Sequence, residues 1–204
     1  MKNFGLVVIG AHIGVHISSE IEKYKNKNIL LIEPVPHNLR ILKKNIPNCD
    51  LIKIEQSAIS ESREIKKFYF IKEDSIHKLK KHWASGIGSF DKQHILNHKT
   101  KRFKVSNDDI ETIEIQCLTF SDILNKYSIK TIDKLLIDVE GAEFEILNSI
   151  DFDKIEIKKI IFEFKHFDET FKVGPKLKKI KEKLIKSNYI LTEIDKENIL
   201  AEKK

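Results

Sequence analysis

Short apolar runs alternate with segments of helical periodicity in the first quarter of the chain. The runs are rich in β-branched residues, as buried strands are, and turn-forming or charged residues bound them. The segments between them repeat apolar side chains every three or four positions, as one face of a helix does. This alternation predicts parallel βαβ units with right-handed crossovers. The predicted strands are residues 6–9, 28–32 and 51–54, and the predicted helices are residues 14–25 and 36–45.

The same alternation returns in the second half of the chain. We expect strands at residues 113–118, 133–137 and 157–164, helices at 119–126, 142–150 and 175–187, and two late strands at 189–194 and 198–201. The expected fold is therefore α/β, with a mostly parallel, twisted sheet of about seven strands, helices on both faces and an antiparallel strand near the end.

Residues 61–111, called the excursion below, interrupt this rhythm. The stretch is rich in Lys and His and lacks clear periodicity. It nevertheless contains Phe68, Phe70 and Trp83, whose large apolar side chains favour burial. We therefore expect short strands or helices packed against the rest of the protein, and a single domain over residues 1–204.

Composition and charge narrow the function classes. The chain has 204 residues and is 41% hydrophobic, which suffices for one sizeable core. The net charge is +6, but Lys is spread along the chain and mixed with Asp and Glu. This pattern favours a solvated surface and argues against nucleic acid as a partner, with a patch for an anionic glycan or nucleic acid as the alternative.

The cysteines and the apolar runs bear on location. Cys49 and Cys117 form no CxxC pair, so we expect two reduced thiols in a cytoplasmic protein. No apolar run approaches the ~20 residues of a membrane-spanning helix. The apolar N-terminus is interrupted by His12 and His16 and lacks a small-residue cleavage site, which argues against a signal peptide.

The first predicted strand ends in a loop typical of ligand binding. Gly10, Ala11 and Gly14 let a ligand approach the backbone, and the following helix offers free N–H donors. Glu33 ends the second strand about 20 residues later, where an acid can accept hydrogen bonds from both ribose hydroxyls of an adenosine. The alternative is a tight turn with glycines for packing and a solvated Glu33.

His12 distinguishes between two adenosine-containing ligands. The dinucleotide fingerprint G-x-G-x-x-G has a glycine at this position, which lets the pyrophosphate lie against the backbone. The imidazole of His12 is hard to reconcile with a pyrophosphate, whereas S-adenosylmethionine carries no phosphate. The spacing therefore favours S-adenosylmethionine over NAD.

Taken in order along the chain, the motifs resemble the FkbM family of S-adenosylmethionine-dependent methyltransferases. VVIGAHIGVHIS is similar to the family's glycine loop, LLIEPVPHNLRILKKN to its E-P-x-P-x-N segment, and QCLTFSDIL to its T-L-D-D-L segment. LLIDVEGAEFEIL carries the most specific signature, D-x-E-G-x-E-x-x-x-L, and IIFEFKH ends a later strand. Three positions depart from the family pattern: Val8 replaces an acid, His12 an Asn and Leu136 a Lys.

The resemblance implies a Rossmann-like class I methyltransferase fold with S-adenosylmethionine as cofactor. It also implies that the excursion shapes the acceptor pocket, with residues 85–90 as candidates for substrate contact. The expected cofactor-binding residues are Gly10, Ala11, His12, Gly14, Glu33, Pro34, Ser57, Ala58 and Asp138.

Asp138 and Glu140 end a strand on the sheet edge that the glycine loop also faces. We expect Asp138 to lie nearest the reacting methyl group and Glu140 to hold or deprotonate the acceptor hydroxyl, with Glu163 and His166 completing the catalytic pocket. In one alternative, Asp138 caps the next helix, and Glu140 and Glu143 favour its positive end. In another, Asp138, Glu140 and Glu163 bind Mg²⁺.

The remaining histidines considered show no metal-ligand spacing, and we predict no resident metal. They are expected on the surface or in packing: His16, His77, His82, His94 and His98. The expected reaction is methyl transfer to a hydroxyl oxygen, on a sugar of a glycan or glycolipid or on a small natural product, and this acceptor class comes from the resemblance alone. The alternatives are an inactive methyltransferase-like binding module and, less favoured, an NAD-linked oxidoreductase.

Overall fold

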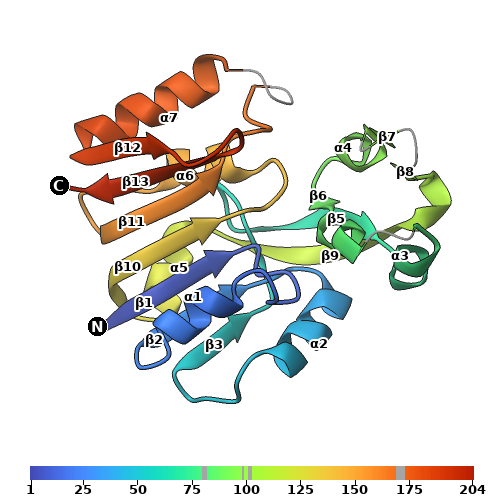
Figure 1. Cartoon of the computed structure of the whole chain (residues 1–204), viewed down its shortest axis with the longest axis horizontal. Coiled ribbons are helices and arrows are strands. Elements are labelled where there is room, and N and C mark those ends of the chain that lie inside the picture. The colour runs from blue at the N-terminus through green and yellow to red at the C-terminus, as the bar shows by residue number, and fades with distance from the viewer. Residues whose placement is uncertain (80–81, 98, 101–102, 169–172) are drawn as a thin grey trace.

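A seven-stranded sheet forms the centre of the protein (Figure 1). The computed structural model describes residues 1–79, 82–97, 99–100, 103–168 and 173–204. The strand order is β12-β13-β11-β10-β1-β2-β3, and β13 is antiparallel to both of its neighbours while the pairs from β11 to β3 are parallel. The strands are β1 (Lys2–Ile9), β2 (Asn28–Ile32), β3 (Ile52–Glu55), β10 (Ile129–Ile137), β11 (Glu156–Glu163), β12 (Tyr189–Glu193) and β13 (Asn198–Lys203). This arrangement confirms the predicted sheet.

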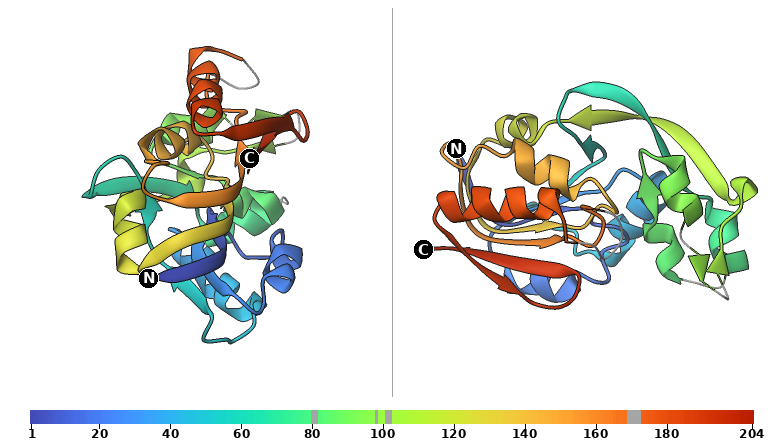
Figure 2. Two further views of the ribbon diagram at one scale, coloured as in Figure 1. Left: turned by 90° about the vertical axis from the view of Figure 1, so that its left-hand side faces the viewer. Right: turned by 90° about the horizontal axis from the view of Figure 1, so that it is seen from above.

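Helices cover both faces of this sheet (Figure 2). Side chains alternate along β1, so that Leu6 and Val8 face one helical layer and Val7 and Ile9 face the other. The first layer contains α1 (Ser18–Lys23) and α2 (Pro36–Asn45). The second contains α5 (Phe120–Lys126), α6 (Glu143–Ser149) and α7 (Pro175–Lys186). Burial of β1 on both faces explains why its sequence is a continuous apolar run.

The excursion and the residues on either side of it form a second, four-stranded sheet with the order β4-β9-β5-β6. β5 and β9 pair antiparallel from Glu64↔Cys117 to Ile71↔Ile110. Its elements are β4 (Ala58–Ile59), β5 (Glu64–Ile71), α3 (Glu73–Leu79), the 3₁₀ helix η1 (His82–Gly86), β6 (Gly88–Ser89), α4 (Lys92–Asn97), β7 (Lys99–Thr100), β8 (Phe103–Lys104), η2 (Asn107–Asp109) and β9 (Ile110–Leu118). The predicted strand at 113–118 therefore belongs to this second sheet and does not resume the central one.

Aromatic side chains of the excursion are buried as predicted. Phe68 and Phe70 belong to a small core with Ile115 and Cys117. The side chain of Trp83 lies outside the described part of the structure, as do the side chain of His82 and all of His98. No helix among the described residues is long and apolar enough to cross a membrane.

Several predicted boundaries were wrong, among them the starts of the first helix and of a central strand. The helix expected from residue 14 begins only at Ser18, and Gly14 itself has a left-handed backbone conformation (φ 82°) that a right-handed helix cannot include. The strand expected from residue 133 begins at Ile129, where it pairs with Lys2 of a β1 that is longer than its apolar run. Both errors lie at element ends, and the sheet topology is unaffected.

Candidate functional site

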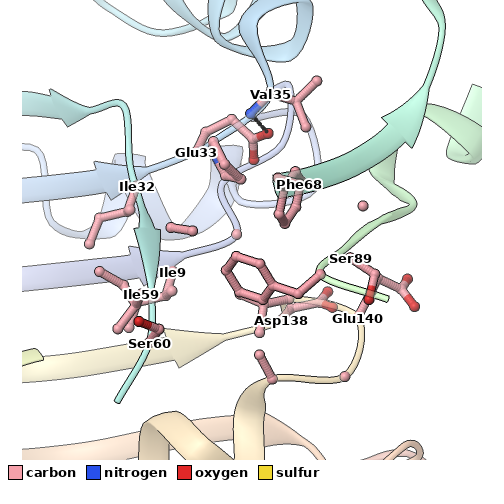
Figure 3. A pocket seen from close by; sticks show the side chains of 18 of the residues that line it. Ile9, Ile32, Glu33, Val35, Ile59, Ser60, Phe68, Ser89, Asp138 and Glu140 are labelled. Atoms are coloured by element: carbon pink, nitrogen blue, oxygen red, sulfur yellow. Dashed lines mark hydrogen bonds between the residues drawn. The ribbon is translucent and has the colours of Figure 1, made fainter. Parts of the chain in front are cut away.

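A cavity of about 760 Å³ opens at the carboxyl ends of β1, β2 and β10. Gly10, Glu33 and Asp138, which are far apart in the sequence, all line it. Figure 3 shows Glu33 on one side of the hollow, and Asp138 and Glu140 on the opposite side. This is the position at which doubly wound sheets bind ligands.

The glycine loop, residues 10–14, crosses directly over the end of β10. Gly10 has a φ of 89°, and a Cβ atom placed on it would lie 1.7 Å from the backbone oxygen of Asp138. The Gly10 and Ala11 N–H groups both donate to the Ile32 carbonyl, at 3.0 and 2.9 Å. Glycine is therefore required at position 10 because the loop backbone packs directly on the end of β10. The same packing brings the loop to the cavity.

The Glu33 carboxylate holds the glycine loop in place through a hydrogen bond. Its Oε2 accepts from the His12 N–H at 2.9 Å, and its Oε1 accepts from the Val35 N–H at 3.0 Å and from Asn38 Nδ2 at 3.3 Å. Burial raises the Glu33 pKa to about 7, against the lowering effect of these donors. A carboxylate offers about four acceptor positions, so Glu33 has room for about one further donor from a ligand.

His12 connects the glycine loop to the excursion. Its side chain lines the cavity, and its Nε2 lies 2.6 Å from the Ser85 hydroxyl. Asn38 Nδ2 donates to the Ser85 carbonyl at 2.7 Å. The loop, α2 and η1 are thus joined on the Glu33 side of the cavity.

The other predicted cofactor residues divide into two groups. Pro34, Ser57 and Ala58 line the cavity. Ala11 is fully buried and Gly14 faces Leu42 of α2, and neither belongs to the described cavity lining. The Ser57 hydroxyl is fully buried and has no hydrogen-bond partner among the described residues. A buried hydroxyl in a cavity wall is suited to a polar ligand, because leaving it without a partner costs free energy.

The acidic loop, residues 138–142, is held by an unexpected carboxylate. Glu143 is almost fully buried, and it accepts hydrogen bonds from the Val139 N–H at 2.8 Å and the Gly141 N–H at 3.0 Å. Burial raises its pKa to about 8. Glu140 has a left-handed conformation (φ 57°), which turns the chain back so that Glu143 can reach these donors. The sequence pattern predicts for Glu143 only a favourable charge at the start of a helix.

Asp138 and Glu140 both reach the cavity, as predicted. The protein around the Asp138 carboxylate, and then the negative charge of Glu140, raise the pKa of Asp138 to about 6. Glu163 is buried outside the described lining, and its Oε1 accepts from Lys165 Nζ at 2.8 Å. Burial raises the Glu163 pKa to about 7.

Two groups of side chains in the described structure have metal-ligand spacing. Asp138, Glu143 and Glu163 form one, so the trio proposed for Mg²⁺ from sequence is divided, with Glu143 in the place of Glu140. Glu140 instead lies in a second group, with His94 and His166. His166 is outside the described cavity lining. The sequence predicts only a surface or packing position for His94.

The excursion forms the remaining wall of the cavity. Gly86, Gly88, Ser89 and Phe90 line it, which matches most of the predicted stretch 85–90. Phe68, for which the sequence predicts only burial, also lines it, and its ring meets that of Phe90 edge-on with centroids 5.3 Å apart. A single sequence contains no signal that distinguishes an aromatic residue lining a cavity from one buried in a core.

Two departures from the family pattern lie in the core. Val8 is buried against α1 and α2, and Leu136 packs against the same cluster. Neither side chain lines the cavity in the described part of the protein. At these two positions the charged residues of the family pattern are replaced by apolar side chains that pack in the core.

Comparison with solved structures gives the same fold. The FkbM methyltransferase of Methylobacillus flagellatus matches 98% of this chain with 14% identity and a TM-score of 0.52, and the chain spans 43% of that protein. The fibrillarin pre-rRNA processing protein of Methanococcus jannaschii matches 100% of this chain with 12% identity and a TM-score of 0.52, over 68% of its own length. No curated protein sequence matches significantly. The predicted Rossmann-like class I methyltransferase fold is therefore confirmed.

A comparison with sequence profiles of protein families assigns the chain to a family. The profile of the methyltransferase FkbM domain matches residues 9–191, which extend from the end of β1 to β12. The match includes the glycine loop, Glu33, the acidic loop and the excursion. The chain belongs to the FkbM methyltransferase family.

Proposed function

We propose that this protein transfers a methyl group from S-adenosylmethionine to a hydroxyl oxygen, on a sugar of a glycan or glycolipid or on a small natural product. The observation that carries the proposal is that one cavity has Glu33 at one side and Asp138 and Glu140 at the other. An adenosine hydroxyl would donate to Glu33, and the positively charged sulfonium group would lie toward the two acids. Membership of the FkbM family supports methyl transfer, and the oxygen acceptor is part of the proposal.

The dimensions and polar groups of the cavity fit this cofactor. Its volume of about 760 Å³ lies within the range of small-molecule sites. Glu33 has about one acceptor position left for a ribose hydroxyl, and the buried Ser57 hydroxyl offers a second polar contact. Ala58 and Ile59 supply apolar wall beside Ser57 for the adenine ring.

S-adenosylmethionine supplies an electrophilic methyl group, which leaves sulfur with the sulfur–carbon bonding electrons staying on sulfur. The residues of this chain then have to align the acceptor oxygen and take up its proton. Asp138 and Glu140, at the end of β10, are placed for these tasks, with His166 at 3.4 Å from Glu140. The excursion, through Ser89, Phe90 and Phe68, supports an acceptor bound on the side facing these acids.

The experiment that tests the proposal has two parts. Calorimetry with S-adenosylhomocysteine, and with NAD as a comparison, measures cofactor choice. Methyl-labelled S-adenosylmethionine with a panel of mono- and oligosaccharides then measures transfer. We expect binding of S-adenosylhomocysteine but not NAD, transfer to oxygen, and loss of transfer in Asp138→Asn with an unchanged melting temperature.

Other outcomes separate the alternatives. Tight S-adenosylhomocysteine binding without transfer to any acceptor class would favour a binding module that lacks catalysis. Binding of NAD in preference would favour an oxidoreductase. Equal transfer by wild type and Asp138→Asn would remove the role proposed for this acid.

A further inference from the structure

Three side chains from distant segments meet beside the cavity. His94 comes from α4 in the excursion, Glu140 from the acidic loop after β10, and His166 from the segment after β11. One ligand atom from each lies within 4.8 Å of the other two. His166 Nε2 is 3.4 Å from Glu140 Oε2, and the His94 and His166 rings meet edge-on with centroids 4.8 Å apart.

This spacing is close to that of a bound metal ion. A tetrahedral ion with bonds of about 2.1 Å holds its ligand atoms about 3.4 Å apart. The His166–Glu140 distance of 3.4 Å already has this value, and the His94 donor lies within 4.8 Å of both partners. His94 also packs on the acidic loop, since a Cβ atom on Gly141 would lie 3.7 Å from its Cε1.

The local charge favours a cation. Asp138 and Glu140 line this end of the cavity, Glu163 lies behind Asp138, and Lys165 forms an ion pair with Glu163. Lys165 bonds to Glu163 at 2.8 Å and approaches Glu197 at 3.4 Å, so its charge is already shared between two acids. A divalent ion at Glu140 would balance the negative charge that remains.

The neighbouring all-carboxylate group is the weaker candidate. Both Glu143 oxygens accept backbone N–H groups, and Glu163 accepts from Lys165. A metal there would have to replace these bonds. The other group has two imidazoles and one carboxylate, and these ligand types suit transition metals better than Mg²⁺.

We propose that His94, Glu140 and His166 bind one divalent transition-metal ion of the Zn²⁺ type in the wall of the cavity. Glu140 lines the cavity, so coordination positions that the protein leaves open would face it. An acceptor hydroxyl that took such a position would be held and acidified by the ion. The role in methyl transfer rests on the proposed function, whereas binding of the ion does not.

The experiment is titration of chelator-treated, tag-free protein with Zn²⁺ by calorimetry, and with Co²⁺ by visible absorption. We expect one Zn²⁺ per chain and Co²⁺ bands in the visible region. His94→Ala, Glu140→Gln and His166→Ala should each weaken Zn²⁺ binding at least tenfold. His77→Ala, in an exposed position on α3, is the matched control and should change it less than twofold.

Melting curves confirm that each variant is folded, and Glu140→Gln preserves the shape of the side chain. Absence of saturable Zn²⁺ and Co²⁺ binding, equal affinity in all four variants, or displacement of Zn²⁺ by equimolar Mg²⁺ would overturn the inference. S-adenosylhomocysteine binding is measured on the same samples. Zn²⁺ binding without S-adenosylhomocysteine binding would support the metal site and contradict the proposed function. S-adenosylhomocysteine binding without Zn²⁺ binding would support the proposed function and contradict the metal site.

Discussion

The glycine loop and the acidic loop are built by the same device and serve different ends. Each follows a parallel strand, each contains residues with positive φ, and each is held by a buried glutamate that accepts two backbone N–H groups. Glu33 holds the glycine loop and also lines the cavity, whereas Glu143 holds the acidic loop and lies outside the described lining. Glu33 therefore both supports a loop and faces the cavity, whereas Glu143 supports a loop without facing the described cavity.

The difference shows how one edge of the sheet can have both firmly held loops and acidic side chains that face the cavity. Because Glu143 supports the acidic loop, Asp138 and Glu140 are left to face the cavity. On the other side, Glu33 both holds the glycine loop and lines the cavity. Substitutions that separate support from contact test this comparison.

The largest expected effect is that of Gly10→Ala. A Cβ atom there would meet the Asp138 carbonyl at 1.7 Å with φ at 89°, so we expect a loss of about 3 kcal/mol or more of unfolding free energy. Gly141→Ala is the matched variant in the acidic loop, since its nearest contact is His94 Cε1 at 3.7 Å. It should cost about 1–2 kcal/mol for its φ alone. Equal losses in urea unfolding would contradict this account of the glycine loop.

The next effect separates the two glutamates. Glu33→Gln and Glu143→Gln each replace an acceptor oxygen with a donor, and each should cost about 1–3 kcal/mol of stability. Their binding effects should differ. Glu33→Gln should weaken S-adenosylhomocysteine binding tenfold or more in calorimetry, while Glu143→Gln should change it less than threefold. A similar loss of affinity in both variants would mean that Glu143 does more than support its loop.

The third effect is a pH dependence that belongs to Glu33. Its pKa of about 7 in the ligand-free protein means that the carboxyl is protonated below this pH, and a protonated carboxyl has lost acceptor capacity. Affinity for S-adenosylhomocysteine should therefore fall about tenfold from pH 8 to pH 6. Glu33→Gln should show a flatter profile in the same titrations. An identical slope in the variant would assign the pH dependence to other groups.

The smallest expected effect is that of Ser57→Ala. The variant removes a buried hydroxyl that has no partner among the described residues, so thermal stability should stay constant or rise by up to about 1 kcal/mol. Affinity for S-adenosylhomocysteine should fall about threefold because a polar contact is lost. A marked loss of stability with unchanged affinity would show that Ser57 is a packing residue only.

The sequence was sufficient to place Gly10, Glu33 and Asp138 together because the carboxyl ends of parallel strands meet at one edge. It was insufficient for Glu143, whose function depends on a chain reversal at Glu140 that no periodicity encodes. His94 was missed for a similar reason. It approaches Glu140 only because β5 and β9 pair over a long sequence separation and bring α4 to the sheet edge.

A crystal structure with bound S-adenosylhomocysteine tests the central claim most directly, because it locates both ends of the ligand at once. The account predicts a ribose hydroxyl within hydrogen-bond distance of Glu33 and the sulfur atom directed toward Asp138. A ligand bound elsewhere, or one whose sulfur points away from the acidic loop, would contradict it.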